Sequence, residues 1–501
     1  MQRRSGIERV GLVTDGEHAV VIAGGGPAGM MLAAELKIAG VDALVVERHG
    51  TRDAGGSRSG GLHARTLEVL DQRGIVDRFL AEGRPAQVAG FAGIRLDISD
   101  FPTRHNYGLA LWQTHFERIL AGWVDELGVQ IMRECEVTSF TQDDDGVTVA
   151  LSGGRSVRTQ YLIGCDGGRS FVRKHAGIEF AGWDPSIASI RAEVETRDEP
   201  EWGIRYTDCG TQAIGPLDGG KRAGIVVTEW YSGQTAEPTL EELSRALIAV
   251  WGTDFGVHSP TSISRFTDMT RQATTYRSGR VLLTGDAAHI HYPVGGQGLN
   301  IGVQDSVNLG WKLAQVVKRV SPEALLDTYH AERHPVAARV LQNTMAQTAL
   351  TRGDERSRAL RETMSDLLSM GEPRRRLAGM MSGLDIRYDV GGEHPLVGSR
   401  MPDLDIDTAH GPTRIYALLH DARPVVLNFA NRGGVDSTAA GERVRSVGAA
   451  YEGKWELPVI GEVDAPSAVV IRPDGHVAWV GDAADASLRD VLTTWFGSGR
   501  G

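Results

Sequence analysis

The stretch AVVIAGGGPAG, residues 19–29, decides the fold. Its first five residues form a short apolar run that is typical of a buried parallel strand, and the glycines that follow end the run. A helical stretch from Met30 to Ile38 comes next, and a second apolar strand, residues 43–46, ends at Glu47. These elements predict a βαβ unit, which is the start of a doubly wound sheet.

The glycines match the dinucleotide-binding pattern Gly24-x-Gly26-x-x-Gly29. The motif alone is a weak indication, but here it follows a strand, opens a helix, and is joined by Glu47 after the next strand. Glycines let the backbone approach a pyrophosphate, the helix N-terminus offers free N–H groups, and Glu47 can accept from ribose hydroxyls. We therefore expect a bound dinucleotide rather than a structural glycine turn.

Size and composition limit the classes of protein. With 501 residues the chain is long enough for two or three domains, and 41% hydrophobic with 23% charged residues is the composition of an ordinary globular protein. A net charge of −11 without a basic stripe argues against nucleic acid and anionic membranes as partners. Three cysteines at unrelated spacings and the lack of a long apolar run favour a cytoplasmic protein.

The pattern of apolar and polar residues along the sequence predicts three domains after an N-terminal extension, residues 1–18. Residues 19–186 and 267–390 form a discontinuous nucleotide-binding domain. Between its halves, residues 187–266 read as short strands with one helical interlude, which indicates an inserted antiparallel sheet that forms a substrate wall. Residues 391–501 read as an appended α/β domain.

Further motifs stand at the ends of apolar strands later in the chain. They are CDGGRS (165–170), GDAAH (285–289) and PVGGQGLN (293–300), beside residues 24–29 with Glu47-Arg48. In this order they resemble the flavoprotein aromatic hydroxylases, class A monooxygenases of the para-hydroxybenzoate hydroxylase fold. Residues 57–58, 63–66, 71–74 and 472–479 look most similar to actinobacterial aromatic polyketide hydroxylases and rifampicin monooxygenases.

The resemblance implies FAD as the cofactor and NADPH or NADH as co-substrate. The cofactor-binding residues that it implies are Gly24, Gly26, Gly29, Glu47, Arg48, Arg58, Gln113, Asp166, Gly285, Asp286, Gly295, Gly296, Gly298, Leu299 and Asn300. In such enzymes Asp286 would bind the ribityl chain and residues 295–300 would surround the isoalloxazine. Pro293, near the flavin edge where oxygen reacts, and Arg58, beside the flavin loop, are the catalytic candidates.

Aromatic residues are the candidates for contact with substrate, although each is also compatible with a packing role. They are Trp112, Tyr206 and Trp230. His289 and His291 have the spacing of a pair, but no third ligand is evident, so we expect no metal.

The resemblance also implies a thioredoxin-like C-terminal domain. No cysteine lies beyond Cys209, so this domain cannot perform dithiol chemistry, and we expect a structural or packing role.

The function implied is hydroxylation of a polycyclic, polyketide-type aromatic by an oxygen from O₂, through a flavin C4a-hydroperoxide. Several alternatives stay open: Baeyer–Villiger insertion, inactivation of a rifampicin-like antibiotic, a flavin- or ligand-binding protein without turnover, and a nicotinamide-only dehydrogenase. A homodimer is considered as well.

Overall fold

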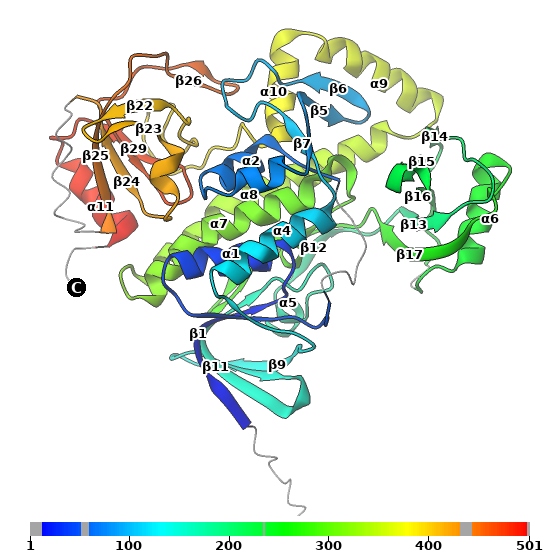
Figure 1. Ribbon diagram of the computed structural model, residues 1–501, viewed down its shortest axis with the longest axis horizontal. Helices are drawn as coiled ribbons and strands as arrows, with labels where there is room; N and C mark the ends of the chain where they lie inside the picture. Colours follow the sequence, from blue (N-terminus) through cyan, green and yellow to red (C-terminus); the bar gives the residue numbers. More distant parts are fainter. Residues whose placement is uncertain (1–12, 52–59, 234–235, 431–442, 498–501) are drawn as a thin grey trace, which may run out of the picture.

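The computed structural model describes residues 13–51, 60–233, 236–430 and 443–497. Figure 1 shows a central α/β body between a small green sheet at the right and the orange-to-red C-terminal unit at the left. No helix within the described ranges is both long and apolar enough to cross a bilayer.

The predicted βαβ unit consists of β1 (Val13–Ala23), α1 (Pro27–Ile38) and β2 (Ala43–Val46). The two strands are parallel and their apolar side chains are buried, which explains the unbroken apolar run. The strand begins earlier than the sequence indicated, because residues 13–18 of the expected extension already pair with the neighbouring strand. Glu17 and His18 are polar and hid the start of the strand, while residues 1–12 lie outside the described part.

The main sheet has the order β19–β20–β11–β1–β2–β8, and a β9–β10 hairpin joins β11. The strands other than β1 and β2 are β8 (Gln130–Met132), β9 (Val137–Gln142), β10 (Val147–Leu151), β11 (Arg155–Gly164), β19 (Arg277–Ser278) and β20 (Val281–Leu283). Because β1, β2, β11 and β20 are parallel, their carboxyl ends meet at one edge of the sheet. Segments far apart in the sequence, at Gly24, Cys165 and Gly285, therefore become neighbours.

Two long helices run through the centre of the molecule (Figure 1), namely α7 (Gln297–Val317), which packs on α1, and α8 (Asp327–Leu350), which packs on α7. A 3-10 turn, η5 (Glu323–Leu326), follows Pro322 and leads into α8. The other elements of this body are β3 (Gly61–Leu62), α2 (Ala64–Asp71), α3 (Val76–Leu80), β4 (Arg84–Ala86), β5 (Val88–Phe91), β6 (Ile94–Asp97), β7 (Gly108–Ala110), α4 (Gln113–Glu126), η1 (Ser152–Gly154), α5 (Phe171–His175), β12 (Phe180–Trp183), β18 (Thr270–Ala273), η3 (Gly285–Ala287), β21 (His289–Ile290), η4 (Val294–Gly296), α9 (Glu355–Leu368) and α10 (Gly371–Ser382).

The inserted sheet is antiparallel throughout, with the order β14–β15–β16–β13–β17. Its elements are β13 (Ile187–Glu195), β14 (Gly203–Thr207), β15 (Gly210–Leu217), η2 (Asp218–Gly220), β16 (Arg222–Trp230), α6 (Leu240–Trp251) and β17 (His258–Thr267). One face packs against Leu243 and Leu247 of α6. The other face is not covered by α6. The antiparallel pairing of all five strands confirms the predicted α/β class with an inserted antiparallel sheet.

The C-terminal unit contains one six-stranded sheet with the order β23–β22–β25–β24–β28–β29. Its elements are β22 (Asp405–Thr408), β23 (Gly411–Arg414), η6 (Tyr416–Leu419), β24 (Val425–Asn428), β25 (Arg445–Ala450), β26 (Glu456–Leu457), β27 (Gly461–Glu462), β28 (Ala468–Ile471), β29 (Val477–Gly481) and α11 (Ser487–Phe496). The β24–β25 pair is parallel, whereas β28 and β29 are antiparallel, an order that agrees with a thioredoxin-like core. Residues 431–442, between β24 and β25, lie outside the described part.

Candidate functional site

The loop after β1 is built so that only glycine fits at two of its three motif positions. Gly24 has a φ of +106°, and a Cβ there would lie 2.4 Å from the Cys165 carbonyl oxygen. A Cβ on Gly29 would lie 2.0 Å from the Gly24 carbonyl oxygen, so the helix and the strand are in close contact. A Cβ on Gly26, in contrast, meets no atom within 4 Å, which leaves room for a ligand.

The first turn of α1 follows Gly26 without a side-chain cap and without an acidic residue. Its N–H groups and the positive end of the helix dipole suit a phosphate. Beside it, Glu47 accepts hydrogen bonds from the backbone N–H groups of Gly25 (2.7 Å) and His49 (2.8 Å). These bonds hold the half-buried Glu47 carboxylate at the mouth of the glycine loop, while Arg48 lies exposed.

The Asp166 carboxylate caps α5. It accepts from the Ser170 hydroxyl at 2.5 Å and from the Phe171 and Val172 N–H groups at 2.7 and 3.0 Å. The backbone, rather than the carboxylate, approaches the glycine loop, because a Cβ on Gly24 would lie 3.1 Å from the Asp166 Cα atom.

The loop after β20 presents one exposed carboxylate, Asp286, between the buried residues Gly285 and Ala287. Farther along, Pro293 and Gly295 are exposed, and Gly295 and Gly296 have positive φ angles that let the chain turn into α7. The first turn of α7 again has no side-chain cap and no acidic residue. Near it, Leu299 is half-buried and a Cβ on Gly298 would lie 3.7 Å from the Asp286 Oδ1 atom.

Asn300 has a role that the sequence did not show. Its buried amide accepts from the His63 N–H group at 2.8 Å and donates to the carbonyl oxygens of Gly296 (2.8 Å) and Gly61 (3.2 Å). The Nε2 atom of His63 donates to the Gly295 carbonyl at 2.9 Å. Burial lowers the pKa of His63 to about 4, so its ring is neutral. Asn300 and His63 together join the segment before α2 to the glycine turn before α7.

The remaining predicted residues lie in two other places. Gln113 is the first residue of α4 and donates to Glu117 at 2.6 Å, and Trp112 before it is 49% exposed, with its ring beside Gly60. Arg58 lies outside the described residues. Tyr206 and Trp230 lie on the inserted sheet, where the guanidinium groups of Arg361 and Arg352 stand 4.5 and 5.6 Å from their respective ring centroids.

Contacts of the Tyr292 side chain place the free face of the inserted sheet against the glycine turn. The Tyr292 hydroxyl lies 3.1 Å from the Ser189 hydroxyl of β13, and the Tyr292 ring packs on Phe266 of β17 with a centroid separation of 5.6 Å. Ser189 and Phe266 are directly opposite each other and therefore share this face. Because Pro293 follows Tyr292, this face stands next to the exposed turn.

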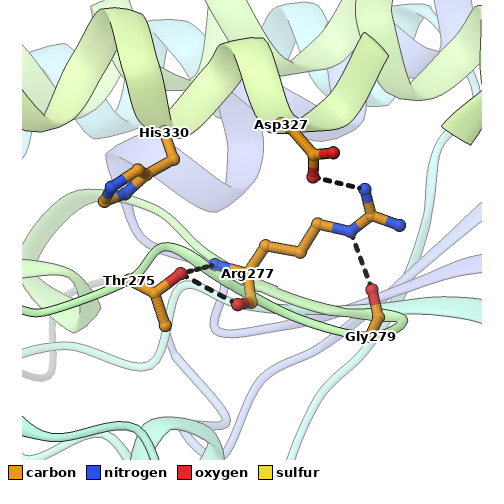
Figure 2. A pocket seen from close by; sticks show the side chains of 5 residues that line it. All are labelled: Thr275, Arg277, Gly279, Asp327 and His330. Atoms are coloured by element: carbon orange, nitrogen blue, oxygen red, sulfur yellow. Dashed lines mark hydrogen bonds and ion pairs between the residues drawn. The ribbon is translucent and has the colours of Figure 1, made fainter. Parts of the chain in front are cut away.

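A separate cavity of about 390 Å³ lies at the amino end of β20, which is the opposite end from Gly285. Figure 2 shows that the Arg277 guanidinium in this cavity is already paired, with Asp327 at 2.8 Å and the Gly279 carbonyl at 2.9 Å. Thr275 and His330 complete the lining. This cavity is therefore distinct from the site formed by the glycine loops.

Two family models cover most of the chain, an FAD binding domain over residues 17–344 and the C-terminal domain of aromatic-ring hydroxylases over residues 394–499. The structure is similar to that of the anhydrotetracycline hydroxylase OxyS from Streptomyces rimosus, with a TM-score of 0.88, 43% identity, and coverage of 96% of this chain and 99% of that one. A rifampicin monooxygenase of Streptomyces venezuelae is 43% identical over 96% of this chain and 98% of its own length. A dialkyldecalin synthase of Streptomyces rugosporus is 38% identical over 95% and 98%, respectively.

The glycine loop with its open position at Gly26, the exposed Asp286 and the uncapped start of α7 fit an extended dinucleotide along one edge of the main sheet. The chain therefore belongs to the FAD-dependent aromatic-ring hydroxylases, which are monooxygenases that consume NAD(P)H.

Proposed function

We propose that this monooxygenase hydroxylates a polycyclic aromatic substrate of the polyketide type. The observation that carries the proposal is similarity over nearly the whole chain to enzymes named for anhydrotetracycline and rifampicin. The free face of the inserted sheet, next to the exposed turn at Pro293, suits a flat ligand.

FAD would lie along the carboxyl edge of the main sheet. The loop at Gly24, Gly26 and Gly29 with the start of α1 would hold the pyrophosphate, and Glu47 would accept from the ribose hydroxyls. Asp286 would bind the ribityl hydroxyls, and the start of α7 would stabilise negative charge on the reduced ring. When bound and reduced by NAD(P)H, FAD supplies the chemistry that activates O₂. The roles of Arg48, Arg58, Gln113 and Leu299 stay predictions.

The substrate would bind between the exposed turn and the free face of the inserted sheet. The Tyr292–Ser189 contact fixes how far Pro293 stands from that face, which supports a role for Pro293 at the reacting edge. Trp230 shares the face with Ser189, since it is opposite Ile187, two positions along β13. Trp230 is 53% exposed and is therefore available to a ligand.

The test uses the FAD-loaded full chain with NADPH and, separately, NADH. Each is incubated with a panel of anhydrotetracycline-like polycyclic phenols and with rifampicin, and the products are analysed by mass spectrometry. We expect nucleotide oxidation that the substrate accelerates, together with a product that gains one oxygen atom. Nucleotide oxidation that no aromatic compound in the panel accelerates would contradict the proposal. Product NMR separates ring hydroxylation from Baeyer–Villiger insertion, and turnover of rifampicin alone would favour antibiotic inactivation.

A second candidate function is carbon–carbon bond formation without net oxidation. The relative named dialkyldecalin synthase, matched over nearly the whole chain, favours it. In that case the mass of the product would equal that of the substrate, and turnover would not consume NAD(P)H.

The predicted homodimer and the predicted cytoplasmic location stay predictions. Light scattering coupled to gel filtration of the FAD-loaded protein tests the first.

A further inference from the structure

Asp305 of α7 holds both ends of the turn that carries Asp286. One carboxylate oxygen, Oδ2, accepts from His289 Nε2 at 2.7 Å and from the Gly285 N–H group at 3.4 Å. Asp286 lies between these two buried residues and is itself exposed. The position of Asp305 therefore determines where the Asp286 carboxylate stands.

Asp305 is in turn held by Arg333 of α8. The Arg333 Nε atom donates to Asp305 Oδ1 at 2.6 Å, and its Nη2 atom donates to the Ile301 carbonyl at 3.3 Å. Burial alone would raise the pKa of Asp305, but Arg333 and His289 hold it below its usual value, so the carboxylate is charged in the fold. Charged hydrogen bonds in a buried setting are strong and directional, so this group is rigidly placed.

Arg333 also contacts Tyr388, which follows α10 on the connection to the C-terminal domain. The Arg333 Nη1 atom donates to the Tyr388 hydroxyl at 3.1 Å. The Tyr388 ring packs on the ring of His476 with a centroid distance of 4.2 Å. His476 belongs to the tight turn at residues 472–476, between β28 and β29 of the C-terminal sheet.

The His476 ring suits this place because it is uncharged. Burial lowers its pKa to about 4, although Asp474 opposes the shift. A protonated ring would stand next to Arg472, whose guanidinium lies 5.4 Å from the Tyr388 ring centroid. The contact between the two domains at this point is thus a neutral ring packed at a tilt on a tyrosine that is hydrogen-bonded to a buried arginine.

We propose that the C-terminal domain positions Asp286 for FAD binding through the connected residues His476, Tyr388, Arg333, Asp305 and His289, with Tyr388 as the positioning residue between the domains. This rests on the proposed placement of FAD against Asp286. The C-terminal domain, which has no cysteines, would thereby help to position a side chain of the cofactor site.

The test compares two tyrosine-to-phenylalanine variants of the full chain. Tyr388→Phe removes the hydroxyl that accepts from Arg333. The matched control, Tyr416→Phe, removes a hydroxyl that is equally buried in the same region and accepts from Arg400 Nε at 3.0 Å. Arg400 makes its other bonds to Glu68 of α2, to Gln72 directly after that helix, and to the Asp474 carbonyl. FAD affinity is measured by titration of the apoprotein, followed by flavin fluorescence, and the bound flavin is examined by visible circular dichroism.

We expect Tyr388→Phe to weaken FAD binding by about three- to tenfold and to change the visible circular dichroism, whereas Tyr416→Phe matches wild type in both. His476→Leu, which changes only the C-terminal domain, should act in the same direction as Tyr388→Phe. The thermal midpoint of each apoprotein shows whether the two tyrosine variants lose similar stability. Wild-type affinity and dichroism in Tyr388→Phe, or equal changes in both tyrosine variants, would overturn the proposal.

Asp286→Ala separates this inference from the placement of FAD. If Asp286→Ala retains wild-type FAD affinity, the placement itself is wrong and the inference is overturned with it. If Asp286→Ala weakens binding while Tyr388→Phe does not, the placement stands and only the role of the C-terminal domain is refuted.

Discussion

Arg472 of the C-terminal domain forms a two-point ion pair with Glu332 of α8, with both N···O distances at 2.7 Å. Neither residue is more than 5% exposed. Lys312 of α7 shares the Glu332 carboxylate at 2.9 Å, and Asp474 binds the Arg472 guanidinium from the other side. Burial would raise the pKa of Glu332, but Arg472 and Lys312 together lower it to about 2. The two domains are therefore joined by charges that neither can solvate alone.

Arg472→Met should destabilise the protein strongly. The substitution retains much of the side-chain volume but removes the guanidinium that both carboxylates share, so that Glu332 keeps only its ion pair with Lys312 and Asp474 loses its ion pair with Arg472. Loss of one partner from such a buried group costs about 3–5 kcal/mol. The free energy of unfolding from urea titration measures the effect.

Arg78→Met is the control for that experiment. Arg78 also forms a two-point pair, with Glu126 at 2.8 Å, but the two side chains are 42% and 59% exposed. Exposed pairs contribute about 0–1 kcal/mol, so the control should remain close to wild type. Equal losses in both variants would show that the Arg472 network contributes no more than a surface pair.

Two alanine substitutions in the glycine loop should have opposite profiles. Gly24→Ala forces a Cβ into the Cys165 carbonyl at a positive φ, so it should destabilise even the apoprotein. Gly26 has a φ of −76° and open space in front of it, so Gly26→Ala should leave the thermal midpoint of the apoprotein near that of wild type. The added methyl group would instead stand where the pyrophosphate approaches and weaken FAD binding by about tenfold or more. Apoprotein melting and FAD titration distinguish the profiles, and wild-type FAD affinity in Gly26→Ala would contradict this reading of the open space.

The parts of the fold that sequence could predict are those set by local patterns. Apolar runs and glycines in residues 19–47 predict the strands and the helix there, and the helical interlude predicted within residues 187–266 is observed as α6. The start of β1 was missed because Gly16, Glu17 and His18 precede the apolar run and interrupt the pattern of a buried strand. The motif Gly24-x-Gly26-x-x-Gly29 also did not show that Gly24 and Gly29 are required by packing, whereas the space at Gly26 is open to a ligand.

The side-chain networks could not be predicted, because they depend on contacts between distant segments. His63 lies far from Asn300 in the sequence, and nothing in either segment indicates their pairing. The same holds for Asp305, which reads as one polar residue in the amphipathic α7 although it holds the turn at Gly285. The only signal in the sequence is that Asp305 is a charged residue within a largely apolar helical segment.

Asn300 should matter as a structural clasp as well as a neighbour of the cofactor. Asn300→Ala removes the hydrogen bonds of the amide to the His63 N–H group and to the Gly296 and Gly61 carbonyl oxygens, which we expect to cost about 1–3 kcal/mol. Asn300→Asp retains the acceptor for His63 but loses both donors, so it tests the two halves of the clasp separately. Thermal melting of the apoproteins is the measurement. An unchanged midpoint in Asn300→Ala would mean that the clasp adds nothing without FAD.

Stability should fall as the pH drops from 6.5 toward 4, because the folded protein holds His476 and His63 in their neutral forms. Their pKa values are about 4 in the fold, against an ordinary value of 6.5 for histidine, so in this window the unfolded chain binds more protons than the folded chain. Each histidine can contribute a slope of up to about 1.4 kcal/mol per pH unit. His476→Gln, which carries no titrating ring, should therefore show a shallower fall in the urea-derived free energy of unfolding between these pH values. If the free energy of unfolding of His476→Gln falls as steeply with pH as that of wild type, the His476 ring is protonated in the fold. The interpretation of this contact as a neutral ring packed on Tyr388 would then be wrong.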